Sequence, residues 1–205
     1  STRMRRTGPA TRTAEANLAS TPIAELRLAG LPRPRLGIGS EARKLFAQAI
    51  EEWKLLMSVA LAGLAREAIR LASAYACERQ AFGQAIGTYQ AISHPLADLI
   101  TDVDGGKYFV WRTVRDIADG KPAAGAQVSL SAWWNADTAT RAVQTALHTF
   151  GGYGLTTEYD IHLYNLRAKA WPLVLGDPEE LLAEAGRRLY GGETASLPDV
   201  GAVPI

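Results

Sequence analysis

Apolar side chains recur every three or four residues over long stretches of this 205-residue chain, which is the period of an α-helix. The first stretch begins at Ser40, which we expect to cap the helix. Its repeating residues are Ile50, Trp53, Met57, Ala60, Leu64 and Ala68. A helix with such a stripe must bury it against other helices, so the pattern predicts a helical bundle.

Further helices are predicted by the same period and by the residues that interrupt it. We expect them at about residues 92–117, 124–150 and 158–171, with a fifth starting at Asp177. Asp-Gly-Lys-Pro at 119–122 and Gly-Gly-Tyr-Gly at 151–154 end the first two. Since long helices with short connections pack antiparallel, we predict an all-α, antiparallel up-down helical bundle with a short N-terminal β-strand extension.

The region before the bundle has a different character. Residues 1–20 begin with several arginines and have no hydrophobic period, so we expect a flexible basic arm. The segment from Thr21 to Gly30 alternates apolar and polar residues, which predicts a strand whose partners lie outside this sequence or in another chain. The expected division is therefore an arm at 1–20, a strand and linker at 21–39, the bundle at 40–190 and a flexible tail at 191–205.

Charge and composition argue against several classes of protein. The 22 Lys and Arg residues nearly balance the 21 Asp and Glu residues, so no basic field favours nucleic acid. No apolar run reaches the ~20 residues that a membrane span needs. Cys77 is the single cysteine, and the three histidines lack the spacing of metal ligands. We therefore expect a cytoplasmic protein that binds no nucleic acid, membrane or metal.

The segment at residues 75–90, YACERQAFGQAIGTYQ, places Arg79, Phe82 and Gln90 around a glycine break between two helices. A guanidinium matches phosphate oxygens, an aromatic ring stacks on a purine and an amide can bind a base or ribose edge. These three groups would suit a dinucleotide. A polar loop with Phe82 as an apolar plug explains the same residues equally well.

A second segment, residues 147–159, has three glycines within four positions, at Gly151, Gly152 and Gly154. Bare backbone of this kind allows close approach, either of a neighbouring helix or of a flat or anionic ligand. By itself this segment does not choose between the two.

Taken together, YACERQAFGQAIGTYQAIS and FGGYGLTTEY resemble two segments of the C-terminal helical domain of the acyl-CoA dehydrogenase family. The resemblance runs from about Thr21 to Leu189 and implies that the expected strand is the last one of the family's middle β-domain. Family members bind FAD on that domain and a fatty-acyl thioester between it and an N-terminal helical domain. The chain would then be the C-terminal portion of such a protein.

The resemblance also implies which residues would contact FAD. Arg79, Phe82 and Gln90 match positions that reach across a subunit interface to the pyrophosphate and adenine end of a neighbour's FAD. Gly151 and Gly152 match the family's second contact to that FAD, and His148 stands where glutamine is usual. The expected cofactor-binding residues are thus Arg79, Phe82, Gln90, His148, Gly151 and Gly152.

The position of the catalytic base departs from the family pattern. Family members remove an α-proton of the thioester with a glutamate, and ungapped reading places that position at Leu175, which cannot accept a proton. Some members keep the glutamate in the first helix of this domain, where the match is Trp53. Glu52 is one residue away, about 100° around the helix, and Glu51 is its neighbour.

The resemblance therefore implies a subunit of a flavin-dependent acyl-CoA dehydrogenase that contributes to FAD binding and oligomerisation and has no base of its own. Its expected partners are a glutamate-bearing subunit of the same family, in a homo- or hetero-oligomer, and an acyl-CoA or steroid-CoA thioester. Two alternatives stay open. One is a catalytic subunit that uses Glu52 or Glu51, and the other is a structural or ligand-binding helical module with a vestigial FAD corner.

Overall fold

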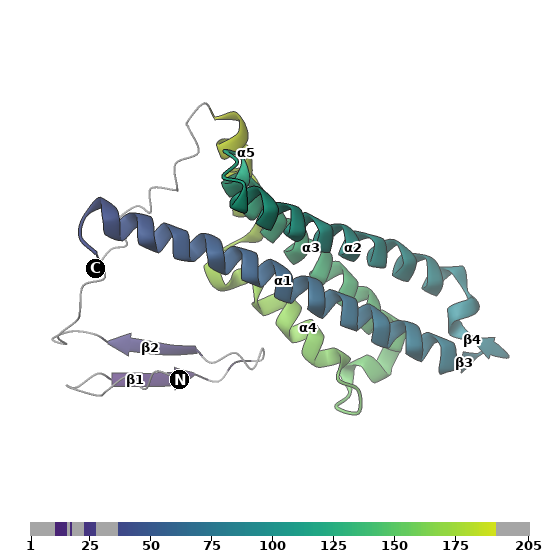
Figure 1. The fold of residues 1–205 in the computed structure, drawn as a ribbon. Helices are drawn as coiled ribbons and strands as arrows, with labels where there is room; N and C mark the ends of the chain where they lie inside the picture. The colour runs from purple at the N-terminus through teal and green to yellow at the C-terminus, as the bar shows by residue number, and fades with distance from the viewer. Residues whose placement is uncertain (1–10, 16, 18–22, 28–36, 192–205) are drawn as a thin grey trace.

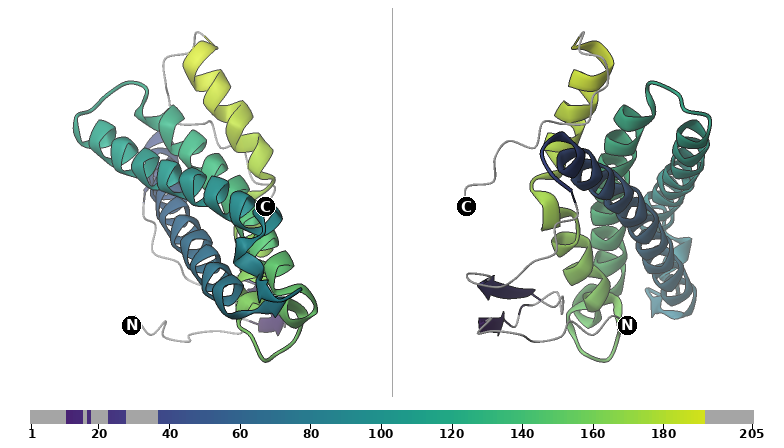
Figure 2. Two further views of the ribbon diagram at one scale, coloured as in Figure 1. Left: turned by 90° about the vertical axis from the view of Figure 1, so that its right-hand side faces the viewer. Right: turned by 60° about the vertical axis from the view of Figure 1, so that its left-hand side comes forward.

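The computed structural model describes residues 11–15, 17, 23–27 and 37–191. Five α-helices form the bundle: α1 (Ser40–Glu78), α2 (Gln90–Ala118), α3 (Ala124–Phe150), α4 (Ile161–Ala170) and α5 (Pro178–Tyr190). Successive helices from α1 to α4 run in alternating directions, as Figures 1 and 2 show. The predicted antiparallel up-down bundle is therefore confirmed.

Helix α3 is the centre of this arrangement, since it contacts each of the other four helices. Its buried face consists mainly of small residues, and Ala139, Ala142 and Ala146 are completely buried. Small side chains let the axes of neighbouring helices come close, and the larger core residues, such as Leu61 and Val103, fill the remaining space.

The buried stripe of α1 is partly rotated from the predicted one. Leu64 and Ala68 are buried as expected, but Ala60 is exposed and Leu61 takes its place in the core. Adjacent residues on a helix point about 100° apart, so the direction of α3 decides which of them is covered.

Two predicted helix starts are wrong in detail and one is confirmed. Ser40 is the first helical residue, and the capping position is Gly39, with φ 61° and no side-chain cap. Helix α4 begins at Ile161 because residues 158–160 form a turn. Asp177 caps α5 as predicted, since its carboxylate accepts a hydrogen bond from the backbone N–H of Glu179 at 3.0 Å.

The predicted N-terminal strand is present as β2 (Ile23–Arg27), but its partner was misplaced by the sequence analysis. Strand β1 (Thr11–Glu15) pairs with it antiparallel, with Thr11 opposite Arg27. Residues 11–15 are therefore a strand where we expected a flexible arm, because exposed strand donors and acceptors pair with the nearest extended segment of the chain. Apart from Asn17, the remaining parts of the expected arm lie outside the described residues, as does the expected tail after residue 191.

A short hairpin joins α1 to α2. Its strands are β3 (Gln80–Ala81) and β4 (Gln84–Ala85), followed by the 3₁₀ turn η1 (Ile86–Thr88). The 3₁₀ turns η2 (Gly151–Leu155) and η3 (Pro172–Leu175) come before α4 and α5 respectively. Among the described helices, none has a stretch long and apolar enough to cross a membrane.

Candidate functional site

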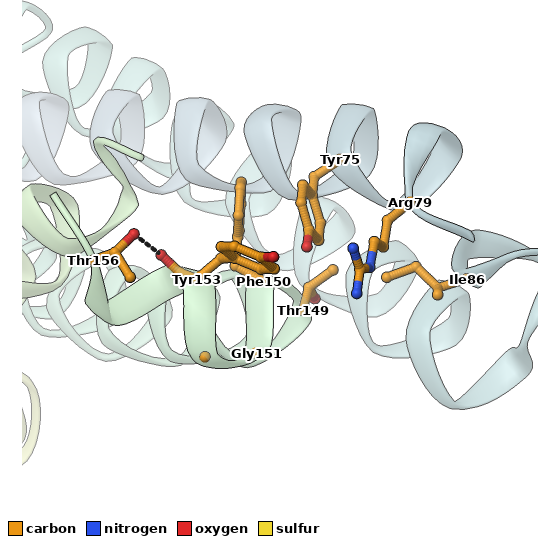
Figure 3. Close-up of a pocket in the computed structure, with 9 residues that line it drawn as sticks. Tyr75, Arg79, Ile86, Thr149, Phe150, Gly151, Tyr153 and Thr156 are labelled. Atoms are coloured by element: carbon orange, nitrogen blue, oxygen red, sulfur yellow. Dashed lines mark hydrogen bonds between the residues drawn. The ribbon is translucent and has the colours of Figure 1, made fainter. Parts of the chain in front are cut away.

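The two segments singled out by the sequence meet at one end of the bundle, although they are about 70 residues apart along the chain. The end of α1 and the hairpin face the turn η2, and a cavity of about 420 Å³ lies between them (Figure 3). We call it the corner pocket. Its lining residues are Tyr75, Arg79, Ile86, Thr149, Phe150, Gly151, Gly152, Tyr153 and Thr156.

Two backbone hydrogen bonds fix the position of Arg79 in the corner pocket. Its N–H donates to the carbonyl of Tyr75 at 2.8 Å, which ends α1, and its carbonyl accepts from the N–H of Ile86 at 2.9 Å. The side chain is exposed, and its guanidinium carbon lies 5.5 Å from the centre of the Tyr153 ring. No carboxylate among the described residues forms an ion pair with it. All its charged donors can therefore serve an outside anion.

The wall opposite Arg79 is aromatic. The Tyr75 ring stacks on Phe150 with ring centres 4.2 Å apart, and Tyr159 packs edge-on against Tyr75 at 5.7 Å. These contacts connect α1 to the end of α3 and to the segment before α4. They give the corner pocket a rigid apolar side next to its one cation.

The three glycines at 151, 152 and 154 have different roles. Gly151 ends α3 with φ 58°, a conformation that other residues rarely adopt, and a side chain on Gly154 would lie 2.8 Å from the carbonyl oxygen of Leu147. Gly152 has neither constraint, because a Cβ there would meet no atom within 4 Å. The fold itself therefore does not require glycine at 152, and its bare backbone leaves room for something outside this chain.

The other expected FAD contacts, Phe82, Gln90 and His148, do not line the corner pocket. Phe82 sits on the hairpin turn with φ 52° and is 96% exposed, so it plugs nothing and the interpretation of this ring as an apolar plug is wrong. Phe82 and Gly83 both have positive φ, as a tight two-residue turn requires, and the turn directs the ring into solvent. Gln90, at the start of α2, and His148, in the last turn of α3, are exposed as well.

A second cavity, of about 460 Å³, lies between α1, α3, η3 and α5, and we call it the α1–α5 pocket. Phe46, Ile50, Trp53 and Met57 form its apolar side. Its polar side includes Asp177, which caps α5, and Glu180, Glu184 and Arg187 on α5. Sequence reasoning pointed to Trp53 only, because the α5 residues lie more than 100 positions away along the chain.

A buried ionic cluster closes one side of the α1–α5 pocket. The ammonium of Lys54, only 4% exposed, donates to Glu51 at 3.0 Å and to Glu184 at 2.7 Å. Arg188 binds both oxygens of Glu51, at 2.9 and 3.0 Å, and Glu184 at 2.6 Å. The sequence analysis missed this cluster, and the only local signal for it was the spacing of the charges within α1 and within α5.

Oppositely charged neighbours shift the pKa values of Glu184 and Arg188. Burial would raise the pKa of Glu184, but the hydrogen bond from Lys54 and the charges of Lys54 and Arg188 outweigh it and lower that pKa. Burial would lower the pKa of Arg188, and the hydrogen bond and charge of Glu51 raise it instead. Glu184 and Arg188 therefore both stay charged because of their partners.

Neither of the two positions that match the family's base, Leu175 and Trp53, carries a carboxylate. The backbone of Leu175 ends η3, and Asp177 uses its carboxylate to cap α5. The carboxylate of Glu180 lies close to Gly176 and lines the α1–α5 pocket. Glu51 is bound by two cations in the ionic cluster. Glu52 is exposed and accepts a hydrogen bond from Gln48 at 3.0 Å, and neither Glu51 nor Glu52 lines the α1–α5 pocket.

Comparison with known proteins gives the family. Acyl-CoA dehydrogenase FadE27 of Mycobacterium tuberculosis is 30% identical over 134 residues, which are 62% of this chain and 36% of that protein. The ChsE4-ChsE5 complex of the same organism superposes with a TM-score of 0.77 at 27% identity, over 88% of this chain and 49% of that one. PigA, solved with FAD and proline, has the same fold, with a TM-score of 0.81 at 19% identity. The match covers 91% of this chain and 50% of that one.

The chain thus spans between a third and a half of the length of these three proteins. The family model described as "Acyl-CoA dehydrogenase, C-terminal domain" matches residues 43–190, from the first turn of α1 to the end of α5. Since this match covers most of the chain and all five helices, the chain belongs to the acyl-CoA dehydrogenase family.

Proposed function

We propose that this chain is a subunit, or the C-terminal part of one, of an FAD-dependent acyl-CoA dehydrogenase, and that it helps to complete the FAD site of a neighbouring subunit without supplying a catalytic base. The observation that carries the proposal is the unpaired Arg79 in the corner pocket, opposite bare glycine backbone. The reaction is α,β-dehydrogenation of a CoA thioester.

The residues of the corner pocket fit the pyrophosphate and adenine end of FAD. Arg79 offers charged donors to phosphate oxygens, and Gly152 leaves space that no atom of the described chain fills. Phe82 offers an exposed aromatic face on the adjoining hairpin, and Gln90 and His148 offer polar groups nearby. When bound, FAD supplies the hydride acceptor for Cβ of the thioester.

The missing base is the reason for proposing a partner. Because position 175 is a leucine, and because Glu51 and Asp177 are engaged in an ion pair and a helix cap, we infer that this chain does not supply the base that removes the α-proton. We infer that a second subunit of the family supplies the glutamate and binds an acyl-CoA or steroid-CoA thioester. The ChsE4-ChsE5 complex, which combines two different chains, supports this arrangement as a precedent.

Arg79→Ala tests the corner pocket directly. We expect the purified assembly that contains this chain to bind FAD at least tenfold more weakly, because a lost charge-assisted phosphate contact is worth about 1.5 to 3 kcal/mol. The measurement is the flavin content of the assembly and its FAD dissociation constant. Circular dichroism should show an unchanged bundle, because the side chain is exposed.

The matched control is Arg43→Ala, an exposed arginine near the opposite end of α1, which should leave FAD binding unchanged. Equal flavin affinity in the wild type and in Arg79→Ala would show that the corner is only a loop. Wild-type assembly without any flavin absorption would favour the purely structural alternative.

Leu175→Glu tests whether the chain holds a complete site. We expect reduction of an acceptor dye with a range of acyl-CoA thioesters to stay at background when this variant is assayed without a partner. A carboxylate accelerates the reaction only if thioester and flavin are already held within hydrogen-bond reach. Turnover by the variant alone would contradict the partner-dependent proposal, and turnover by the wild type alone would locate the base at Glu52 or Glu51.

A further inference from the structure

The ring of Tyr153 is the partner of the Arg79 guanidinium in the corner pocket. The central carbon of the guanidinium lies over this ring, 5.5 Å from its centre. Within the described part of the chain, no hydrogen bond or ion pair holds the same side chain. An exposed arginine without contacts samples many rotamers, and fixing one of them when a ligand binds costs conformational entropy. The contact with Tyr153 therefore narrows the choice of rotamers before a ligand arrives.

An aromatic partner leaves the cation free for an anion. The face of an aromatic ring is electron-rich and attracts a guanidinium that lies within about 6 Å of its centre. A ring, unlike a carboxylate, neither neutralises the positive charge nor occupies its N–H donors. Arg79 is thus held in place while its charge and its hydrogen bonds remain available to phosphate oxygens.

Tyr153 is itself fixed through its backbone and through its ring. Its carbonyl oxygen accepts hydrogen bonds from the N–H of Thr156 at 3.1 Å and from the hydroxyl of Thr156 at 2.9 Å, and Figure 3 shows the second of these. Its ring packs edge-on against Tyr159, with ring centres 6.0 Å apart, and Tyr159 packs in turn against Phe150 at 5.1 Å. The ring next to Arg79 therefore belongs to the same aromatic wall as Phe150.

The ring of Tyr153, and not its hydroxyl, makes the contact with Arg79. No described residue forms a hydrogen bond with this hydroxyl, and the residue is 43% exposed. Loss of the hydroxyl should leave the ring where it is, whereas loss of the ring should free the side chain of Arg79. Two substitutions can therefore separate the two parts of Tyr153.

We propose that Tyr153 is a positioning residue of the corner pocket, whose ring holds the Arg79 guanidinium in the orientation that binds the pyrophosphate of FAD. Tyr153 acts through Arg79 and needs no contact with the flavin. The two residues come from different elements, the end of α1 and the turn η2, so their contact also fixes Arg79 relative to the backbone of Gly151 and Gly152. This inference rests on the proposed function, because it gives Arg79 the same ligand.

Substitution of Tyr153 in the purified assembly that contains this chain tests the proposal. Tyr153→Leu should weaken FAD binding about two- to fivefold, the size expected of an exposed cation–π contact. Tyr153→Phe keeps the ring and should bind FAD as the wild type does. The matched control is Tyr190→Leu at the end of α5, where the tyrosine is 86% exposed, and it should leave FAD binding unchanged. The measurement is the FAD dissociation constant after removal and titration of the flavin, and a Tyr153→Phe variant as weak as Tyr153→Leu would overturn the proposal.

A double-mutant cycle with Arg79→Ala separates positioning from a purely structural role. Because Tyr153 acts through Arg79, Tyr153→Leu should have no further effect on FAD binding once residue 79 is alanine. A loss of the same size in both backgrounds would show that Tyr153 supports the fold or touches FAD directly, and this result would contradict the proposal.

The same measurements distinguish this inference from the proposed function. If Arg79→Ala weakens FAD binding and Tyr153→Leu does not, the inference about Tyr153 is wrong and the proposed function stands. If Arg79→Ala has no effect on FAD binding, both are wrong.

Discussion

Replacing Lys54 with methionine is expected to lower the free energy of unfolding by about 3 to 5 kcal/mol, the largest effect of any variant considered for this chain. Methionine fills a similar volume but removes the ammonium that lies between Glu51 and Glu184. Among the described residues, the two largely buried carboxylates then share Arg188 as their cation, and the hydroxyl of Ser129 donates a further hydrogen bond to Glu184. The measurement is chemical denaturation near neutral pH.

A second substitution separates charge imbalance from lost packing. Adding Glu184→Leu to Lys54→Met leaves the balanced pair of Glu51 and Arg188, so the double variant should be more stable than Lys54→Met alone. If the double variant is no more stable than Lys54→Met, the cluster contributes through packing and not through its charges.

The pH dependence of the wild type provides a further check. The pKa of Glu184 is lowered in the folded state, so its ionised form stabilises the protein above its unfolded pKa. That stabilisation is lost as the pH falls through the folded pKa. In Lys54→Met the carboxylate has lost its main partner, and its protonation relieves the imbalance. The difference in stability between wild type and variant should therefore shrink in acid.

Gly106→Ala is expected to destabilise the bundle by about 3 kcal/mol, at the upper end for an added methyl group in a packed core. Gly106 is buried where α2 meets α3, and a Cβ there would lie 2.4 Å from Oδ1 of Asn135 and 3.1 Å from the ring of Trp134. Asn135 cannot turn away freely, because it is 1% exposed and its amide donates to the carbonyl of Ser131 at 2.9 Å. The two helices must therefore move apart.

If the clash with Asn135 causes the loss of stability, a second substitution that removes the clashing atom should restore part of it. Shortening the opposing side chain in Gly106→Ala, Asn135→Ala should recover part of the loss, since the atom nearest the new methyl group is removed. Gly63→Ala is the matched control: it lies in the middle of α1, where a Cβ meets nothing within 4 Å, and should stabilise the chain by up to about 1 kcal/mol. Thermal melting of the three variants would test both expectations, and a neutral Gly106→Ala would show that the α2–α3 contact is loose.

The corner pocket shows what a sequence motif can and cannot predict. Arg79, Gly151 and Gly152 were expected to act together, and the structure brings all three into one cavity. Phe82 was expected either at a ligand or in a plug, and its exposure excludes the plug. The direction of its ring depends on two positive φ angles in the hairpin turn, which residue spacing does not encode.

By itself the sequence determined the helices, most of their ends and the residues of the family motifs, because helical periodicity, capping and glycine breaks act over a few neighbouring positions. Only the tertiary structure decided that Leu61 and not Ala60 enters the core, that β1 pairs with β2, and that Glu51 and Lys54 join Glu184 and Arg188. Each of these outcomes depends on how one element is rotated and placed against another that is distant in the chain. That placement results from the packing of all the helices at once, and no local pattern carries it.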